Sequence, residues 1–555
     1  MLDYKMVKDD KGFEWIETEL RGKELLTTYL LNKGTAFTYE ERCALELLGK
    51  LPARIETLEE QIVRAYRQYK KYRSDLQRHI YLNNMHDKNE VLFFKLVTEH
   101  LAEMLPIIYT PIVGQAVKNF SHEYRQPRGL YISYPDQDKI DFILSNRTHP
   151  EISIIVVTDG ERVLGIGDQG VGAIGIPIAK LILYTMCGGI NPYHTLPILL
   201  DVGTNNEKLL KDPLYLGWRN RRIRGEEYDR FIERFVTAVK QHFPNSLLHW
   251  EDFGRDNARR ILEKYRQDLC TFNDDMQGTA VVALAALLNA VKRLKSNLSS
   301  QRVVILGAGT AGVGIADVIV EGMNREGLSL SDARERIWLV DKEGLLTKGV
   351  EEIMLFQVPY VRKEGQKLSL EELVNEVKPT VLIGCSSATG AFTESIVRNM
   401  AAFTERPIIF PLSNPNEKAE ASPFDLLVWT GGKALIATGS PFNGQFAQCN
   451  NAFSFPGIGL GLVASKATRL TDSMLWEAVK TLCSCAPSED NSPLLPELSQ
   501  ARDVAYKIAL AVTKDACRSG FSKLPIEDCE KAVQETLWEP YYRPIRPISN
   551  LAKRG

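Results

Sequence analysis

The chain reads VVILGAGTAG from Val303 to Gly312, and this stretch decides the fold of the region around it. The first four residues are apolar and mostly β-branched, which predicts a buried strand, and the segment from Val313 onward is typical of a helix. Gly307, Gly309 and Gly312 therefore fall on the turn between strand and helix. Glycines there permit a tight turn and let a pyrophosphate approach the positive N-terminus of the helix. The bare G-x-G-x-x-G pattern is weak, but this context predicts a Rossmann-type domain that binds a dinucleotide.

The next apolar run ends at Asp341, where such domains hold the adenosine ribose. Asp341 lies farther along the chain than the usual spacing, so the intervening helix and loop must be extended. A carboxylate there accepts hydrogen bonds from the ribose hydroxyls and repels a 2′-phosphate, which favours NAD. Lys342 and Lys348 are close in sequence and could pair with such a phosphate, so NADP stays open as an alternative cofactor.

Outward from this turn, short apolar runs alternate with segments long enough for a crossover helix. The same pattern occurs in an earlier region of the chain, with runs at 152–157 and 196–200. The region around the glycine turn has runs at 303–306, 337–340, 381–383 and 408–410. Continuous apolar runs of this kind are typical of strands buried on both faces of a parallel sheet. Residues 38–125 have helical apolar spacing instead.

We therefore expect a multidomain α/β protein: a helical N-terminal region, a parallel-sheet catalytic domain and a Rossmann-type NAD-binding domain. The predicted boundaries are a helical domain at 1–127, a catalytic domain at 128–274 plus 451–525, the Rossmann domain at 275–450 and a C-terminal extension at 526–555.

Length and composition agree with this division and exclude several classes of protein. At 555 residues the chain exceeds the roughly 250–300 residues that one hydrophobic core serves. A formal net charge of −2 gives no field that would attract nucleic acid or an anionic membrane as a general partner. The basic run at 219–224 is followed at once by Glu226 and Glu227, so we interpret it as a solvated surface turn.

The nine cysteines have no metal-finger spacing, which argues for reduced thiols and a cytoplasmic protein. The N-terminus has no apolar core of a signal peptide, and the apolar stretches fall short of the roughly 18–20 residues that span a bilayer.

Two acidic pairs, Glu251-Asp252 and Asp274-Asp275, stand where a strand or helix should give way to a loop. Carboxylates brought together repel one another unless a cation lies between them, and oxygen ligands without a neighbouring His or Cys indicate Mg²⁺ or Mn²⁺. Either pair alone would be an ordinary helix cap or an exposed acidic surface. A second glycine-rich turn, Gly165–Gly170, contains Asp168, which would repel a pyrophosphate, so we interpret it as an active-site turn.

Beyond these features, ordered segments from about Leu31 to Arg546 resemble the malic enzymes. The matching segments are LNKGTAF from Leu31, IIYTP from Ile107, TDGER from Thr158, GTNN from Gly203, the two acidic pairs, PLSNP from Pro411 and QCNN from Gln448. The resemblance implies an oxidative decarboxylase that converts L-malate to pyruvate and CO₂ while reducing NAD(P). It also implies a homo-oligomer, since relatives form dimers that pair into tetramers.

The resemblance assigns roles to residues that, taken singly, would pass for core or surface positions. It implies that Glu251, Asp252 and Asp275 bind the metal. It makes Lys180 the base for the hydroxyl proton, Tyr109 the acid that protonates C3, and Asp274 the residue that orients or tunes Lys180. Lys180 then needs a lowered pKa, which burial beside a cation would provide.

The malate carboxylates would be held by Arg162, Asn414 and Asn451, and Asn414 would also contact the dinucleotide. One departure from the relatives lies close to these residues: the loop at 443–447, shortly before Asn450 and Asn451, is shorter than in the relatives.

Two alternatives remain at this point. A malolactic enzyme uses the same scaffold and bound NAD but yields lactate; such sequences tend to differ at the positions of Thr110 and Arg162, which favours the malic enzyme. A redox sensor that binds NADH without catalysis would leave both acidic pairs unexplained.

Overall fold

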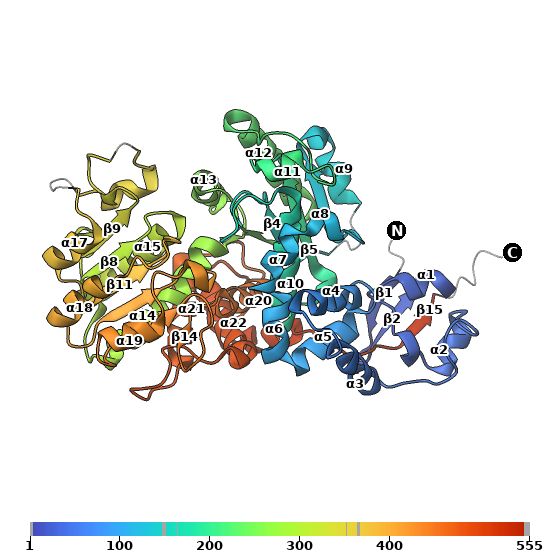
Figure 1. Cartoon of the computed structure of the whole chain (residues 1–555). Helices are drawn as coiled ribbons and strands as arrows, with labels where there is room; N and C mark the ends of the chain where they lie inside the picture. Colours follow the sequence, from blue (N-terminus) through green and yellow to red (C-terminus); the bar gives the residue numbers. More distant parts are fainter. Residues whose placement is uncertain (1–3, 147–150, 164, 351, 363–366, 549–555) are drawn as a thin grey trace.

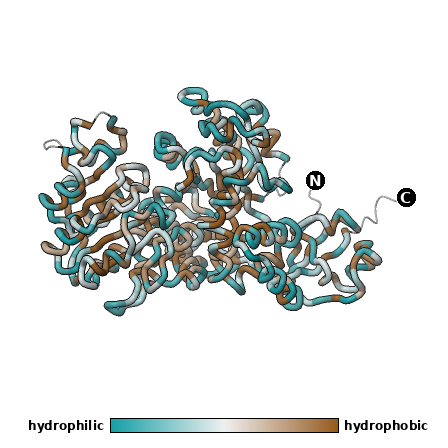
Figure 2. Tube along the Cα trace, in the orientation of Figure 1, coloured by the Kyte–Doolittle hydropathy of each residue, from teal (hydrophilic) through white to brown (hydrophobic). Residues whose placement is uncertain are grey.

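The computed structural model describes residues 4–146, 151–163, 165–350, 352–362 and 367–548. Figure 1 shows three parts in a row: the N-terminal helices at the right, a first α/β region in the middle and a second at the left. Both termini lie at the right-hand end. Apolar residues concentrate in the interior of the trace, and polar residues dominate its outer helices (Figure 2). Among the described residues, no helix is both long and apolar enough to cross a bilayer.

The N-terminal part is largely helical, as residues 38–125 predict. Its helices are α1 (Gly22–Thr27), α2 (Tyr39–Ala44), α3 (Leu58–Tyr69), α4 (Asp75–His86), α5 (Glu90–Glu99), α6 (Leu101–Ile108), α7 (Ile112–Lys118) and α8 (Phe120–Glu123). A feature that the sequence did not predict precedes them. The hairpin of β1 (Tyr4–Lys8) and β2 (Glu14–Thr18) is joined by β15 (Ile545–Pro547), which pairs parallel to β2. The end of the predicted C-terminal extension thus packs against the start of the chain.

The first α/β region contains a five-stranded sheet in the order β3-β5-β4-β6-β7, with every neighbouring pair parallel. Its strands are β3 (Leu130–Ser133), β4 (Ile154–Thr158), β5 (Thr195–Asp201), β6 (Leu247–Trp250) and β7 (Thr271–Asn273). Its helices are α9 (Ile140–Ser145), α10 (Gly175–Met186), α11 (Glu207–Lys211), α12 (Gly225–His242) and α13 (Arg255–Tyr265). Strand β4 is buried on both faces: Ile154 and Val156 pack into one hydrophobic cluster and Ile155 and Val157 into another. The continuous apolar run is therefore explained by a doubly covered strand, as predicted.

The second α/β region contains a seven-stranded sheet in the order β10-β9-β8-β11-β12-β13-β14. Its strands are β8 (Val303–Leu306), β9 (Ile337–Asp341), β10 (Gly344–Leu345), β11 (Val381–Gly384), β12 (Ile408–Pro411), β13 (Leu435–Thr438) and β14 (Ala447–Gln448). Its helices are α14 (Thr279–Arg293), α15 (Thr310–Arg325), α16 (Leu330–Glu335), α17 (Leu370–Val377), α18 (Glu394–Phe403) and α19 (Pro423–Trp429). All pairs are parallel except β10 with β9. The four predicted strands of this region are present, and they form the expected doubly wound sheet.

From β8 the chain moves outward to β9 and then returns to the other side of β8 as β11. This reversal of strand order is the topological switch point, and ligands bind outside the carboxyl ends of the strands there. The C-terminal helices are α20 (Phe455–Ser465), α21 (Asp472–Cys485), α22 (Ala501–Arg518) and α23 (Cys529–Thr536). They join the main hydrophobic cluster together with α10 and α14. The predicted domain boundaries stay a prediction.

Candidate active site

A cavity of about 270 Å³ lies between loops that follow the strands of the two parallel sheets. Glu251 and Asp252 follow β6 of the first sheet, whereas Asn414 follows β12 of the second. Six of the predicted site residues line this cavity: Tyr109, Lys180, Glu251, Asp252, Asn414 and Asn451.

The two acidic pairs come together because β6 and β7 are parallel neighbours, with Trp250 opposite Asn273. Glu251 follows the first strand and Asp275 lies in the one-turn π-helix Asp274–Gly278 that follows the second. Three carboxylate oxygens, one from each of Glu251, Asp252 and Asp275, lie within 4.8 Å of one another. The backbone N–H of Asp252 donates to Asp275 Oδ2 at 2.8 Å, which fixes the two loops together.

The electrostatics of Glu251 and Asp275 fit a divalent cation. Burial, opposed in part by Lys180, raises the pKa of Glu251 to about 7. Burial and the charge of Glu251 raise the pKa of Asp275 to about 8. Asp275 Oδ1 is buried and has no hydrogen-bond partner among the described residues. The Asp275 carboxylate is therefore costly to ionise and lacks a hydrogen-bond donor. A bound cation would stabilise it on both counts.

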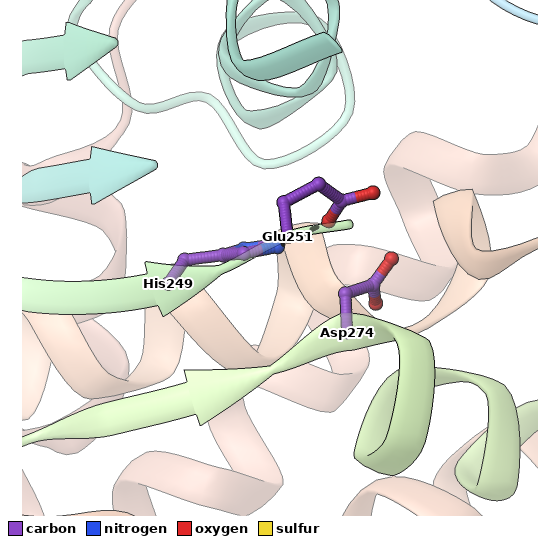
Figure 3. Close-up of side chains that lie close together, drawn as sticks. All are labelled: His249, Glu251 and Asp274. Carbon is purple, nitrogen blue, oxygen red and sulfur yellow. Dashed lines mark hydrogen bonds and ion pairs between the residues drawn. The ribbon is translucent and has the colours of Figure 1, made fainter. Parts of the chain in front are cut away.

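A second group of potential ligands, His249, Glu251 and Asp274, shares Glu251 with the first (Figure 3). The protein itself already bridges this group. Lys180 Nζ lies 3.0 Å from Glu251 Oε1 and contacts Asp274 Oδ2, and His249 Nε2 is 2.7 Å from Glu251 Oε2. An ammonium occupies the space between the two carboxylates, so the first group is the better candidate for a metal.

Lys180 projects from α10 and is buried, with its ammonium 5.5 Å from the centroid of the Tyr109 ring. Burial alone lowers the pKa of Lys180, but the charges of Asp274 and Glu251 outweigh it and raise the pKa well above its ordinary value. The lowered pKa expected for Lys180 beside a bound cation stays a prediction, since the protein groups alone raise this pKa. Burial raises the pKa of Tyr109 as well, which keeps its hydroxyl protonated.

Two of the predicted site residues are the asparagines Asn414 and Asn451, and both have hydrogen-bond partners in the structure. Asn451 Nδ2 donates to Asp274 Oδ2 at 2.9 Å and to Thr279 Oγ1 at 3.2 Å. Asn414 accepts a hydrogen bond from the hydroxyl of Ser440. Asp274 thus accepts hydrogen bonds from both Lys180 and Asn451. This buried acid holds together the predicted base, Lys180, and a residue predicted to bind a malate carboxylate, Asn451.

Sequence reasoning missed the support behind Glu251. The Tyr184 hydroxyl is 2.9 Å from His249 Nδ1, and His249 in turn contacts Glu251. All three side chains are buried, and burial lowers the pKa of His249 to about 3, so the imidazole is neutral. The signal was available in part: residues two apart on a strand share one face, and His249 lies two before Glu251.

The predicted dinucleotide turn lies at the switch point, between β8 and β11. Gly307 has φ +112°, and an added Cβ would lie 2.8 Å from the Cys385 backbone, so only glycine fits. A Cβ on Gly312 would lie 1.8 Å from Gly307 O. At Gly309 the nearest atoms are those of the Arg162 guanidinium, 3.8 Å away, so the turn is open on this side. Asp341 ends β9, the strand next to β8.

Arg162 therefore lies beside the dinucleotide turn, and it is not among the residues that line the cavity. The glycine-rich turn that follows it approaches the second sheet, because a Cβ on Gly165 would lie 2.9 Å from Asn414 O. Arg222 anchors this turn: its guanidinium donates to both oxygens of Asp168 at 2.7 Å. Arg222 is buried, so the prediction of a fully solvated basic run is wrong at this position.

Two family models match the chain: "Malic enzyme, N-terminal domain" over residues 86–266 and "Malic enzyme, NAD binding domain" over residues 276–517. Proteins named NAD-dependent malic enzyme are similar over nearly the whole chain. That of Vibrio campbellii is 49% identical over 542 residues, which cover 94% of this chain and 96% of the relative. That of Shewanella sp. (strain MR-4) is 51% identical over 549 residues, covering 95% and 98%.

The chain belongs to the malic enzyme family. It is an oxidoreductase of that family, and the match to the family's NAD-binding domain covers its second α/β region together with α20, α21 and most of α22. Solved malic enzymes share the fold. The Entamoeba histolytica malic enzyme superposes with a TM-score of 0.57 at 23% identity, covering 89% of this chain and 90% of that one. The Pyrococcus horikoshii malic enzyme gives 0.54 at 23% identity, covering 79% and 89%.

Proposed function

We propose that this protein converts L-malate to pyruvate and CO₂, reduces NAD, and requires Mg²⁺ or Mn²⁺. One observation carries the proposal: carboxylate oxygens of Glu251, Asp252 and Asp275 lie within 4.8 Å of one another, and Glu251 and Asp252 line the cavity that Lys180 and Tyr109 also line. The names of the relatives support NAD as the oxidant.

In this proposal Glu251, Asp252 and Asp275 hold the divalent cation. Asp275 presents an unsatisfied buried oxygen, and the carboxyl pKa values of Glu251 and Asp275 are raised. When bound, such a cation acts as a Lewis acid toward the C2 oxygen and offsets the carboxylate charge that raises the pKa of Lys180. His249 orients Glu251 through a hydrogen bond, and Tyr184 in turn holds His249. Hydrogen-bond partners of this kind orient the side chains that bind a metal.

Lys180 would accept the proton of the C2 hydroxyl, and NAD, when bound, would supply the oxidant that takes the hydride from C2. Its position between Asp274 and Glu251 supports this role, since both acids hold the ammonium that forms. After CO₂ departs from the resulting β-keto acid, C3 needs a proton. Tyr109 supplies it: it lies across from Lys180 and stays protonated because burial raises its pKa.

Asn414, Asn451 and Arg162 bind the malate carboxylates in this scheme. Asn414 and Asn451 line the cavity, which supports them directly. Arg162 lies at the dinucleotide turn, so its contact with malate requires that the side chain swing toward the cavity when the substrate binds.

The test incubates the purified protein with L-malate, Mn²⁺ and NAD and quantifies NADH, pyruvate and lactate. Equal amounts of NADH and pyruvate, abolished by EDTA, are expected. Lactate without NADH would identify a malolactic enzyme, and NADH binding without turnover would identify a sensor. The same assay with NADP in place of NAD tests the role of Asp341 in cofactor choice.

We also propose a cytoplasmic homo-oligomer, dimer or tetramer, by analogy with the family. The nine cysteines are all unpaired, which agrees with a reducing compartment. Light scattering that gives a monomer would contradict the assembly.

A further inference from the structure

A second cavity of about 270 Å³ lies away from the active site, on the seam between the two α/β regions. Arg259 of α13 lines it from the first region, and α14, α15 and α16 line it from the second, with α21 closing it. An ion pair crosses the seam at this point, since Arg259 Nη2 donates to Asp317 Oδ2 at 2.6 Å. Tyr360 donates to the other oxygen of Asp317 at 2.7 Å.

Two arginines lining this cavity have donors that the protein does not use. Arg259 donates a hydrogen bond from Nη2 to Asp317. Its Nη1 is buried and has no hydrogen-bond partner among the described residues. Arg334 lines the same cavity, and within the described ranges its guanidinium makes no hydrogen bond or ion pair. A buried guanidinium nitrogen without a partner carries the full cost of its lost hydration. An anion between Arg259 and Arg334 would remove that cost.

The acids of the cavity do not cancel this positive charge. Asp317 is bound by Arg259 and Tyr360, Glu321 by Arg325, and Asp472 by Arg266. The unmatched charge is therefore that of Arg334, next to the spare donor of Arg259.

The rest of the wall is apolar and aromatic. It comprises Val281, Leu284, Val318, Val320, Leu330, Leu475, Val479 and the ring of Trp476. An apolar cavity of about 150 Å³ accepts benzene, so this one has room for a ring and an attached anionic group.

We propose that this seam cavity is a binding site for a small organic anion that presents a phosphate or carboxylate to Arg259 and Arg334 and a flat apolar ring to Trp476. The site is separate from the malate cavity, since no residue lines both. The proposal does not depend on the substrate assigned above.

The two helices that meet at the seam cavity lead to the two halves of the active site. Helix α13 begins three residues after Asp252, and Arg259 lies on its second turn. Helix α15 begins at the dinucleotide turn, with Asp317 about 10 Å along it at 1.5 Å per residue. Gly314 of α15 also packs on the backbone of Met276, the neighbour of Asp275. An anion bound to both regions would therefore change the affinity for NAD, and NAD would change the affinity for the anion by the same factor.

The experiment measures binding of phenyl phosphate and of benzoate by calorimetry, with the enzyme saturated with NAD so that the dinucleotide turn is occupied. Saturable binding of at least one probe is expected, and the preferred probe decides between phosphate and carboxylate. Arg334→Met should weaken binding at least tenfold, because it removes a charge-assisted hydrogen bond. Arg334 has no partner to lose among the described residues, so this variant should fold normally.

Arg398→Met is the matched control. Arg398 pairs with Glu394 on α18, and neither residue lines the cavity, so binding should change less than twofold. Arg259→Met provides the second test and should also weaken binding. The proposal is overturned if neither probe binds, if binding is unaffected by both Arg334→Met and Arg259→Met, or if the affinity for NAD is the same with and without the bound probe.

Discussion

Asp275→Asn should have opposite effects on the metal-free and the metal-loaded protein. In the metal-free protein the substitution removes a carboxylate that is buried close to Glu251. With a divalent cation present, the same substitution removes a ligand. The stability of the variant relative to the wild type should therefore depend on Mn²⁺.

The size of the first effect follows from the pKa of Asp275, which burial and Glu251 raise from 3.8 to about 8. Between these two values the unfolded chain loses the proton while the folded protein keeps it, so folding stability falls as the pH rises through this window. By pH 7 the penalty is on the order of 2–4 kcal/mol. Asparagine carries no such penalty. In EDTA at pH 7 the variant should be more stable than the wild type by roughly this amount, and the difference should vanish near pH 4.

The second effect follows from ligand linkage: a cation at a hundred times its Kd stabilises the folded state by about 2.7 kcal/mol. Urea unfolding in EDTA and in Mn²⁺, at pH 4 and pH 7, measures both effects. Asp256→Asn is the matched control, because Asp256 is close in sequence to the site but its side chain is 70% exposed. A variant that is less stable than the wild type in EDTA at pH 7, or one that Mn²⁺ stabilises as much as the wild type, would refute the reasoning.

Three further predictions follow from individual contacts. Lys180→Met should lower kcat by about 10²–10⁴-fold while the Kd for NAD, measured by NADH fluorescence, changes little; a kcat within threefold of wild type would exclude Lys180 as the base. Tyr109→Phe should lower kcat by at least about 10²-fold and change the free energy of unfolding by only about 0.5–1.5 kcal/mol, so a loss of activity caused by unfolding would count against its role as the acid. Gly312→Ala should abolish NAD binding, because its Cβ would lie 1.8 Å from Gly307 O, whereas Gly309→Ala, with 3.8 Å to Arg162, should fold normally; equal NAD affinities of Gly312→Ala and the wild type would contradict the packing of the turn.

The sequence predicted best those features whose cause is local. The run 303–306 and its glycines specify a strand, a turn and a helix within one short segment, and β8 and α15 are present as expected. The acidic pairs were predicted where a strand or a helix gives way to a loop, and Glu251 and Asp274 directly follow the strands β6 and β7.

Features that depend on distant partners were missed. Strand β15 has three residues, and it forms only because β2, more than 500 positions earlier, offers an edge. The basic run at 219–224 has the local pattern of a surface turn, yet Arg222 is buried because Asp168, 54 residues away, accepts its guanidinium. The surroundings of Lys180 were predicted only in part: Asp274 was expected beside it, but the contact with Glu251 was not.

The central claim is that Glu251, Asp252 and Asp275 hold the divalent ion. Crystals grown with Mn²⁺ and NAD, measured at the manganese absorption edge, test it most directly. The account predicts one anomalous peak bonded to carboxylate oxygens of these three residues and facing the cavity that Lys180 lines. A peak between His249 and Asp274, or none near residue 275, would contradict it.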